Sequence, residues 1–564
     1  MGLADVTHPA PRTLSLEVDG RSVEVPDDGA DLLTVLRERL AITSPKDGCS
    51  PQGQCGCCTV LVAGAPRVAC VTPARRVRGR AVTTLDGLDS ATRRSWVEAF
   101  TACGASQCGF CTPGIILRLE GLRAKGLRGD DTQAVEQALL AHLCRCTGWR
   151  TILDAWAEFH RAGSGGCTAT RATKRSKADA QVRAELEGRN PQRVGPEVTL
   201  GQGGFADDTA PREALVAVPD DRAASGWSIA ETLVEARAAS GKIQGRRTTG
   251  GLSYPLDLPQ GDWDATLRTT WTEPAYLETD ASWCRPGEEP ASPLANGGAF
   301  GGKTLSPASR AAKQLAEQYG RPLRVVLSRE DAVRMGAKRP PVAGGARADG
   351  SGVLRVARTP GVAEAVRSVA PGLEVEEVDV AGPPTSAALR AAGWAEALAL
   401  VTAARLRGAA PGEVELSSPE GATARARVVL GDHPGVRVWV RCGQPLDAVV
   451  LRSYCVGASH AALSLVCNEG LAVDEAGTVH DLTIRSFGVL RAVDTPPIDI
   501  EIDPDAGRPV NGSDAVFVAV ATAAWLVQGA PTDWPTGCFA SQGTRGGARG
   551  GGEVGSGGRF ARRA

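Results

Sequence analysis

Three cysteine strings dominate the sequence: GCSPQGQCGCCTV at residues 48–60, SQCGFCTPG at 106–114 and LCRCTGWR at 143–150. Ten of the 16 cysteines lie between Cys49 and Cys146, and the other six are scattered singly. In a reducing compartment, tightly grouped cysteines are more often metal ligands than disulfide partners. The pattern therefore predicts metal centres in the N-terminal third of the chain.

The first group combines a short cysteine-rich loop with one distant cysteine: Cys49, Cys55, Cys58 and then Cys70. Plant-type [2Fe–2S] ferredoxins space three ligands as C-x4-C-x2-C and add a distant fourth; this loop has one residue more between the first two. Three loop glycines permit a tight curl with backbone N–H groups near sulfur. Zinc is the alternative, but zinc sites usually show pairs of short C-x2–4-C spacings. Cys57 cannot restore the usual spacing, so we treat it as a non-ligand.

The second group consists of two close pairs, Cys108 with Cys111 and Cys144 with Cys146. The pairs are separated by about the length of a helical hairpin, so they would converge in a helical bundle. Taken alone, this group does not decide between zinc and an iron–sulfur cluster.

Turn and periodicity signals divide the chain into an α+β series of domains, because 564 residues exceed what one core supports. Leu14–Val18 and Ser22–Val25 alternate around Asp19-Gly20, which predicts a hairpin. Ser306-Pro307 begins a predicted helix that ends at Gly320 and precedes a strand. We expect a small mixed domain at 1–85, a helical domain at 86–160, a linker at 161–190, an α+β region at 191–530 and a disordered Gly-rich tail at 531–564.

The three cysteine strings together resemble the small subunit of the xanthine dehydrogenase and aldehyde oxidoreductase family of molybdenum hydroxylases. The resemblance covers residues 13–160 and implies a β-grasp ferredoxin domain followed by a four-helix domain, each with one [2Fe–2S] cluster. It assigns the ligands as Cys49, Cys55, Cys58 and Cys70 for the first cluster, and Cys108, Cys111, Cys144 and Cys146 for the second. It also implies that Gln107 and Cys146 lie against the pterin of a molybdenum cofactor.

A glycine-rich segment, NGGAFGGK at residues 296–303, is the main signal in the remaining chain. Glycines around one phenylalanine let backbone N–H groups approach an anionic ligand. The segment resembles the GGxFGGK string of the same family's molybdopterin-binding subunit. The resemblance implies cofactor contacts for Gly298, Phe300, Gly301 and Gly302 in a shortened molybdopterin-binding region.

Two altered strings resemble the family's active-site segments. Arg390 opens RAAGWAE, which implies a side chain facing substrate or cofactor; a surface arginine at a helix start is the alternative. Asp514 in NGSD occupies the place of the family's general-base Glu, one methylene shorter. Asp514 could instead be an N-cap, since Asp is among the best capping residues.

The resemblance implies an oxidoreductase: a molybdenum hydroxylase chain that oxidises a small purine, aldehyde or N-heterocycle with oxygen from water. Electrons would pass through both clusters to a separate FAD-binding subunit, because no FAD-domain segment is recognisable here. The alternative is a non-catalytic iron–sulfur electron-transfer or scaffold subunit with a degenerate molybdopterin region. A homodimer of the complex is a further expectation.

Charge and hydropathy limit the other function classes. Lys and Arg total 63 against 64 Asp and Glu, which argues against a nucleic-acid or anionic-membrane binder. No run of 18 apolar residues and no secretory signal is recognisable. We therefore expect a cytoplasmic protein.

Overall fold

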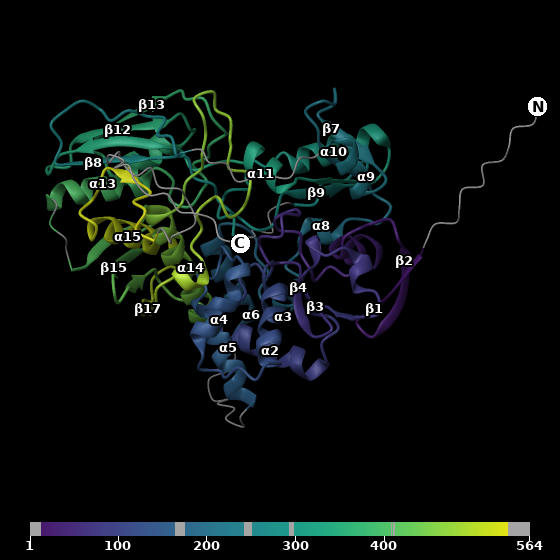
Figure 1. Cartoon of the computed structure of the whole chain (residues 1–564). Coiled ribbons are helices and arrows are strands. Elements are labelled where there is room, and N and C mark those ends of the chain that lie inside the picture. The colour runs from purple at the N-terminus through teal and green to yellow at the C-terminus, as the bar shows by residue number, and fades with distance from the viewer. Residues whose placement is uncertain are drawn as a thin grey trace, which may run out of the picture.

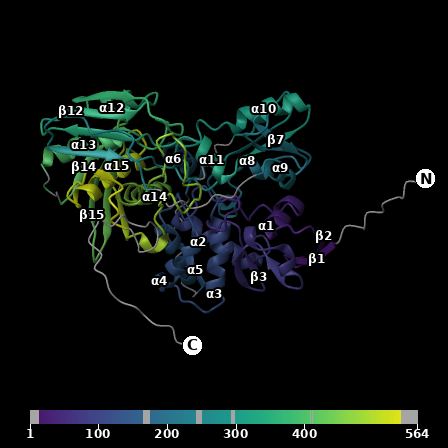
Figure 2. The ribbon, with the colours of Figure 1, turned by 45° about the horizontal axis from the view of Figure 1, so that its top comes forward.

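The computed structural model describes residues 13–163, 175–241, 251–292, 298–407, 409 and 412–539. Its described part forms four sheets and a helical bundle (Figure 1). The N-terminal domain and the helical bundle lie side by side, and the C-terminal half packs against both in the two views (Figures 1 and 2).

The first domain is a five-stranded mixed sheet in the order β2-β1-β5-β3-β4. The hairpin predicted around Asp19-Gly20 is confirmed, with both residues at positive φ. Alternate residues of β1 are buried and pack on the helical segment after β2, which closes the core. The elements are β1 (Thr13–Val18), β2 (Arg21–Pro26), α1 (Leu32–Thr34), a π-helical turn (Val35–Arg39), β3 (Thr59–Val62), β4 (Ala65–Val68), η2 (Ala69–Val71), η3 (Ala74–Val77) and β5 (Ala81–Thr83).

The second domain is helical, as predicted. Trp96 stacks on Phe159 with 3.9 Å between ring centroids, so the long first and last helices share an aromatic core. The elements are α2 (Ser90–Cys103), α3 (Thr112–Arg123), α4 (Thr132–Ala138), a 3-10 turn (Leu139–Ala141) and α5 (Arg150–Gly163).

The prediction of a linker at 161–190 is wrong for the second half of this range, which forms helix α6 (Lys177–Gly188). Ser176 caps this helix by accepting from Asp179 N–H. Ala180, Arg183 and Ala184 are buried against the C-terminal half, so tertiary packing stabilises a segment whose composition suggested a flexible spacer. Residues 164–174 lie outside the described residues.

A second sheet, in the order β7-β6-β10-β9, follows the short helices α7 (Pro196–Thr199) and α8 (Ala206–Thr209). The helix predicted after Ser306-Pro307 is confirmed and ends at Gly320, whose φ is 62°. The elements are β6 (Leu215–Pro219), β7 (Trp227–Ala230), α9 (Leu233–Ala239), β9 (Ala281–Cys284), α10 (Ala308–Tyr319), β10 (Leu323–Val326) and α11 (Arg329–Met335).

The C-terminal half has two sheets, β13-β12-β11-β8-β18 and β14-β15-β16-β17, that share one large core with four helices. The elements are β8 (Ala265–Thr269), β11 (Val342–Ala346), β12 (Gly352–Ala357), α12 (Val362–Val369), β13 (Leu373–Val378), α13 (Trp394–Leu406), β14 (Val414–Ser417), β15 (Thr423–Val429), β16 (Gly435–Arg441), α14 (Ala448–Cys467), a 3-10 turn (Ala492–Asp494), β17 (Ile498–Ile502), α15 (Ser513–Leu526) and β18 (Asp533–Trp534). Among the described helices, α14 alone is long and apolar enough to cross a membrane, but 89% of its apolar window is buried inside the protein, as in a core helix.

The predicted disordered tail, 531–564, is wrong at its start. Strand β18 pairs with β8, and Cys538 forms a disulfide with Cys467 at the end of α14. These long-range contacts hold residues 531–539, whereas 540–564 lie outside the described residues. Both cysteines of the disulfide belong to the scattered ones outside the two groups.

Candidate cofactor sites

The four cysteines of the first group are linked by sulfur–sulfur contacts. Cys49 accepts sulfur hydrogen bonds from Cys55 and Cys70, which hold the pKa of its thiol well below the ordinary value. Cys70 also contacts Cys58, and donation together with burial raises the pKa of Cys70. All four side chains are at most 5% exposed. A thiol set from a curled loop and one later strand end is the donor set that a [2Fe–2S] cluster takes.

The longer loop still curls around Cys49. Ser50 and Gly53 both adopt positive φ, and this tightens the chain between the first two ligands. The N–H groups of Gln52 and Gln54 approach Cys49 Sγ at 3.3 and 3.4 Å. Such N–H contacts favour the thiolate that iron binds. The extra residue is therefore accommodated without losing Cys49 from the group.

The second group also forms one cluster of sulfurs. Cys146 Sγ lies 3.5 Å from Cys108 Sγ, and Cys144 accepts from Cys111 and Cys146. The two pairs thus converge as expected from the helical domain. Within the described residues, no three His, Cys, Asp or Glu side chains surround a position suited to a single metal ion; a [2Fe–2S] cluster instead spreads four thiolates over two irons.

The two cysteine groups are carried by neighbouring segments. Leu143 N–H donates to Cys55 O at 3.0 Å, so the strings that carry both groups are directly hydrogen-bonded. A β-carbon on Gly56 would lie 2.5 Å from His142 Cδ2. This close approach needs glycine, and it brings the two groups near each other.

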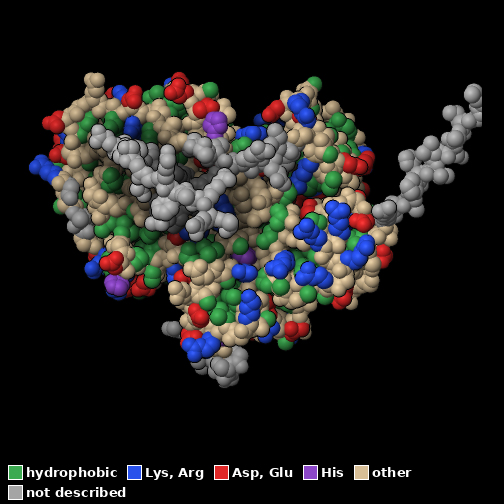
Figure 3. All heavy atoms as spheres, in the orientation of Figure 1, with side chains coloured by type: hydrophobic (Ala, Val, Ile, Leu, Met, Phe, Trp, Pro, Cys, Tyr) green, Lys and Arg blue, Asp and Glu red, His purple; other side chains and the backbone are tan. Residues whose placement is uncertain are grey.

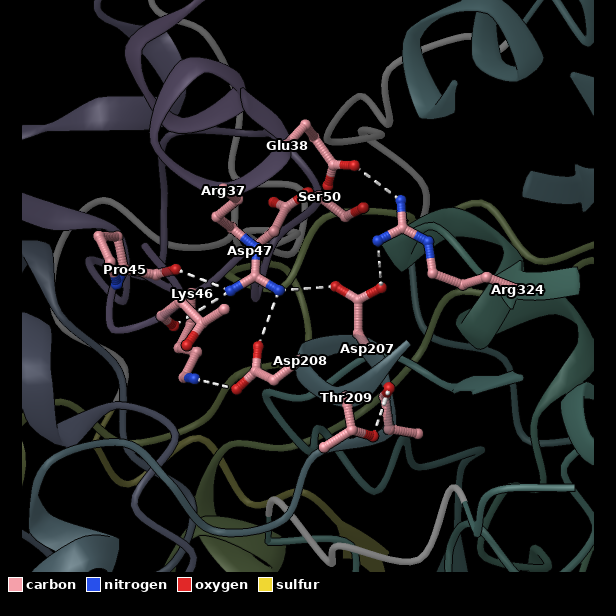
Figure 4. A network of polar contacts seen from close by, with 12 residues as sticks. Arg37, Glu38, Pro45, Lys46, Asp47, Ser50, Asp207, Asp208, Thr209 and Arg324 are labelled. Carbon is pink, nitrogen blue, oxygen red and sulfur yellow. Dashed lines mark hydrogen bonds and ion pairs between the residues drawn. The ribbon is translucent and has the colours of Figure 1, made fainter. Parts of the chain in front are cut away.

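An ionic network fixes the chain just before the first group (Figure 4). Arg37 donates to Asp207 and Asp208 at 2.8 Å, and its other nitrogen binds Pro45 O at 3.0 Å. The two carboxylates outweigh burial and raise the pKa of Arg37. Lys46 pairs with Asp208 as well. The first domain is thereby held to α8, which carries both aspartates.

The glycine-rich segment contacts the second group directly. A β-carbon on Gly298 would lie 3.3 Å from Cys146 Sγ, and Gly298 has a φ of 86°. On the other side, a β-carbon on Gly301 would lie 1.8 Å from Ala388 O. Glycine is therefore required at both positions, because the segment is wedged between the second cysteine group and the loop before Arg390. Asn296 and Gly297 lie outside the described residues.

Gln107 bridges the helical domain and α14. Its Nε2 donates to Cys146 O at 2.9 Å and to Ser453 O at 3.0 Å. Its Oε1 is buried and has no hydrogen-bond partner among the described residues. A buried amide oxygen without a donor costs about 1–3 kcal/mol, and the amino group of a pterin could supply that donor.

Arg390 and Phe300 form one stack beside this segment. The Arg390 guanidinium lies 3.7 Å from the centroid of Phe300, and Arg390 N–H donates to Phe300 O at 3.1 Å. Arg390 is 5% exposed, so the alternative of a surface arginine is wrong. Burial lowers its pKa. The structure thus places Arg390 against the glycine-rich segment, and its predicted contact with substrate or cofactor stays a prediction.

A pocket opens between the Gly298–Phe300 turn and α14. It has about 450 Å³ of free space including its mouth, and three arginines and two glutamates line it: Arg145, Arg339, Arg390, Glu273 and Glu469. Arg390 Nη1 is buried and has no hydrogen-bond partner among the described residues. An oxyanion or a polar ring edge would fit this donor. Gly302 lies behind the pocket, against Pro274.

Asp514 lies behind Arg390 rather than in the pocket lining. Arg390 Nε is 3.2 Å from Asp514 Oδ1, and Arg189 pairs with Oδ2. Both carboxylate oxygens are thus occupied by guanidinium groups. Asp514 lies in the first turn of α15, after the N-cap residue Gly512. Its N–H donates to Asn511 Oδ1 at 3.0 Å. The alternative of Asp514 as an N-cap is therefore wrong.

Helix α6 supplies two residues that the sequence reasoning missed. Glu187 accepts the N–H groups of Gly512 and Ser513 at 3.1 and 2.8 Å, at the start of α15. Arg189, just after α6, pairs with Asp514. The sequence does contain a signal for this helix. Ser176 followed by Asp179 is typical of a helix start, and two alanines four residues apart indicate a narrow buried face.

Three comparisons with known proteins place these sites in a family. A model described as "[2Fe-2S] binding domain" matches residues 84–157. One component of the nicotinate dehydrogenase of Pseudomonas putida is 41% identical over 147 residues, which are 25% of this chain and 91% of the relative. The chain belongs to the molybdenum hydroxylase family. Xanthine dehydrogenase of Calliphora vicina is 37% identical over 166 residues, or 27% of the chain and 12% of the relative.

The fold extends this likeness beyond the aligned segment. The aldehyde oxidoreductase of Desulfovibrio desulfuricans superposes with a TM-score of 0.65 at 14% identity, over 91% of this chain and 97% of that one. The chain is thus a mixed α+β multidomain molybdenum hydroxylase homologue, in a family of oxidoreductases with iron–sulfur and molybdopterin cofactors. It matches only 12% of the length of the curated xanthine dehydrogenase, so its own reaction and partners are subjects for proposal.

Proposed function

We propose that this chain is the iron–sulfur and molybdopterin chain of a molybdenum hydroxylase. It oxidises a small purine, aldehyde or N-heterocycle with oxygen from water and passes the electrons through two [2Fe–2S] clusters to a separate flavoprotein subunit. The close approach of Gly298 to Cys146 carries the proposal, because it brings the glycine-rich segment against a predicted ligand of the second cluster.

The electron path follows the contacts between the sites. Cys146, against which both Gln107 and Gly298 lie, would hold the second cluster on the side where electrons would enter it. The hydrogen bond from Leu143 N–H to Cys55 O links the segments that would hold the two clusters, so it would lie on the path between them. Each transfer then runs over a direct contact, which suits one-electron steps between two buried centres.

The chain's own residues would hold the cofactor and orient the substrate. Bound molybdenum cofactor supplies the oxidising centre. Gln107 Oε1 would accept from the pterin, the Gly298–Gly302 turn would present its backbone N–H groups to an anionic group of the cofactor, and the stacked Arg390 would offer Nη1 to the substrate. Asp514 positions Arg390 through its ion pair.

A second candidate function has one specific observation in its favour. A general base must offer a carboxylate oxygen to the proton that it takes, yet both oxygens of Asp514 are paired with Arg390 and Arg189. This pairing favours a chain that keeps the clusters and transfers electrons but does not catalyse hydroxylation.

Metal content and substrate-driven cluster reduction separate the two functions. Purified chain is assayed for iron, sulfide and molybdenum, and then mixed anaerobically with xanthine, an aromatic aldehyde or nicotinate. The enzyme is supported by molybdenum near one per chain and by bleaching of the cluster absorbance with one of these substrates. Four irons without molybdenum support the electron-transfer chain, and zinc in place of iron refutes both.

A further inference from the structure

We infer that an arginine patch around Cys70 is the surface where an acidic electron-transfer protein docks. The patch consists of Val71 and the five arginines of residues 65–80, namely Arg67, Arg75, Arg76, Arg78 and Arg80, and all six side chains are exposed. The inference rests on the proposed function for the identity of the partner as a flavoprotein. Its location rests on the residues themselves.

The first cluster is nearest to solvent at Cys70. Cys70 is 5% exposed, whereas Cys49 and Cys55 are 1% exposed and Cys58 is fully buried. The other side of the loop is covered: Arg329 Nη2 donates to Gly48 O at 2.7 Å. An electron leaving this cluster therefore has its shortest protein path through η2, which holds Cys70 and Val71.

Val71 gives the patch an apolar centre. It is 57% exposed, far above the other residues near this cluster, and its Cγ1 would lie 2.9 Å from a β-carbon on Gly53 of the cluster loop. Val71 thus links the cluster loop and Cys70 to the surface. An apolar centre with a charged rim is the usual anatomy of a transient protein interface.

The rim carries one sign of charge. Residues 65–80 contain five arginines and no acidic residue. Arg78 lies 3.8 Å from Asp27, and no ion pair within the described chain engages the other four. Figure 3 shows Lys and Arg side chains gathered over the part of the surface that the first domain forms. The whole chain is nearly neutral, so this concentration is local.

Charge complementarity determines the class of partner. A local positive field attracts an acidic protein and raises its association rate by about 10- to 1,000-fold at low salt. In each encounter one electron leaves the reduced first cluster, which returns to its oxidised form, and the partner's flavin gains that electron. Together with the proposed function, the charge of the patch gives a flavoprotein with an acidic face around its flavin edge as the partner.

Two haem proteins of opposite charge serve as probes. The clusters of the whole chain are reduced with dithionite, excess reductant is removed, and reoxidation by ferric cytochrome b5, which is acidic, or ferric cytochrome c, which is basic, is followed by stopped flow. Each haem iron takes one electron from one cluster. At low salt we expect cytochrome b5 to react at least tenfold faster with the chain than with the variant R75E/R76E/R80E.

A matched variant and salt complete the test. R212E/R310E/R405E reverses three exposed arginines outside the first domain and should react like the unaltered chain. At 1 M salt, where the Debye length is about 3 Å, the difference for cytochrome b5 should vanish, and cytochrome c should show the opposite trend. Equal losses in both triple variants, or no loss in either, would overturn the arginine patch as docking site.

Chemical reduction keeps this test independent of molybdenum. A chain without molybdenum but with an R75E/R76E/R80E effect would refute the proposed hydroxylase and leave the docking surface standing. A molybdenum-containing chain without that effect would refute only the docking surface. Iron content of each variant, which should stay at about four per chain, excludes loss of the cluster as the cause.

Discussion

Replacing Asp514 with Asn tests what this carboxylate does. The substitution keeps the shape of the side chain but removes the anion between Arg390 and Arg189. Arg390 is 5% exposed, so its guanidinium would remain buried without a counter-charge. Breaking a buried ion pair from one side costs about 3–5 kcal/mol. Loss of a helix cap would cost only about 1 kcal/mol.

Urea unfolding followed by circular dichroism measures this cost. The control is Asp379→Asn, which breaks the exposed pair with Arg358 and should cost about 0–1 kcal/mol. The double variant Asp514→Asn/Arg390→Gln should regain part of the lost stability, since no guanidinium is then left unpaired. If Asp514→Asn is no less stable than Asp379→Asn, the ion pair does not hold the site together.

Dye reduction with the best substrate separates positioning from proton transfer. A base role predicts a rate loss of about a hundredfold or more in Asp514→Asn even under conditions where the protein stays folded. Asp514→Glu keeps the negative charge, so it should retain the ion pairs with Arg390 and Arg189. Turnover should therefore persist in this variant whether the carboxylate positions Arg390 or acts as the base. Unchanged turnover in a folded Asn variant would show that Asp514 is not the base.

The remaining predictions concern the clusters, the flavin and acid stability. Cys111→Ser should remove about half of roughly four irons per chain, measured with acid-labile sulfide; retention of all four would contradict the ligand assignment. The isolated chain should show no flavin absorbance and should not reduce NAD, while molybdenum-containing protein should reduce an artificial dye. Burial lowers the pKa of His460 to about 4, so the stability that neutral His460 contributes is present above pH 6.5 and falls as the pH drops toward 4. Between pH 7 and 5 the loss is about 2 kcal/mol, and His460→Gln should lose less over this range in urea titrations at both pH values.

Local signals in the sequence predicted much of the N-terminal half. The Asp19-Gly20 turn and the alternation on either side specify a hairpin without help from distant residues. The cysteine strings carry their own loop geometry, and their sulfurs converge as proposed. The glycine-rich pattern singled out Gly298 and Gly301. The close neighbours that require glycine there, Cys146 and Ala388, come from distant segments of the chain.

Long-range contacts explain what the sequence did not reveal. Helix α6 has a mostly charged surface. Glu187 in this helix and Arg189 just after it contact the start of α15, which lies more than 300 residues away in the sequence. The disulfide of Cys538 joins two cysteines that look like scattered single residues. No local pattern pairs such residues, because only the folded core brings them together.

The burial of the second cysteine group sets an order for assembly. A β-carbon on Gly457 of α14 would lie 1.8 Å from Cys146 O, so the backbone of this core helix rests on the ligand loop itself. With α14 and the Gly298 turn in contact with the segment of Cys146, all four thiols of this group are at most 7% exposed. We therefore expect iron and sulfide to be delivered before the C-terminal half packs against the N-terminal third.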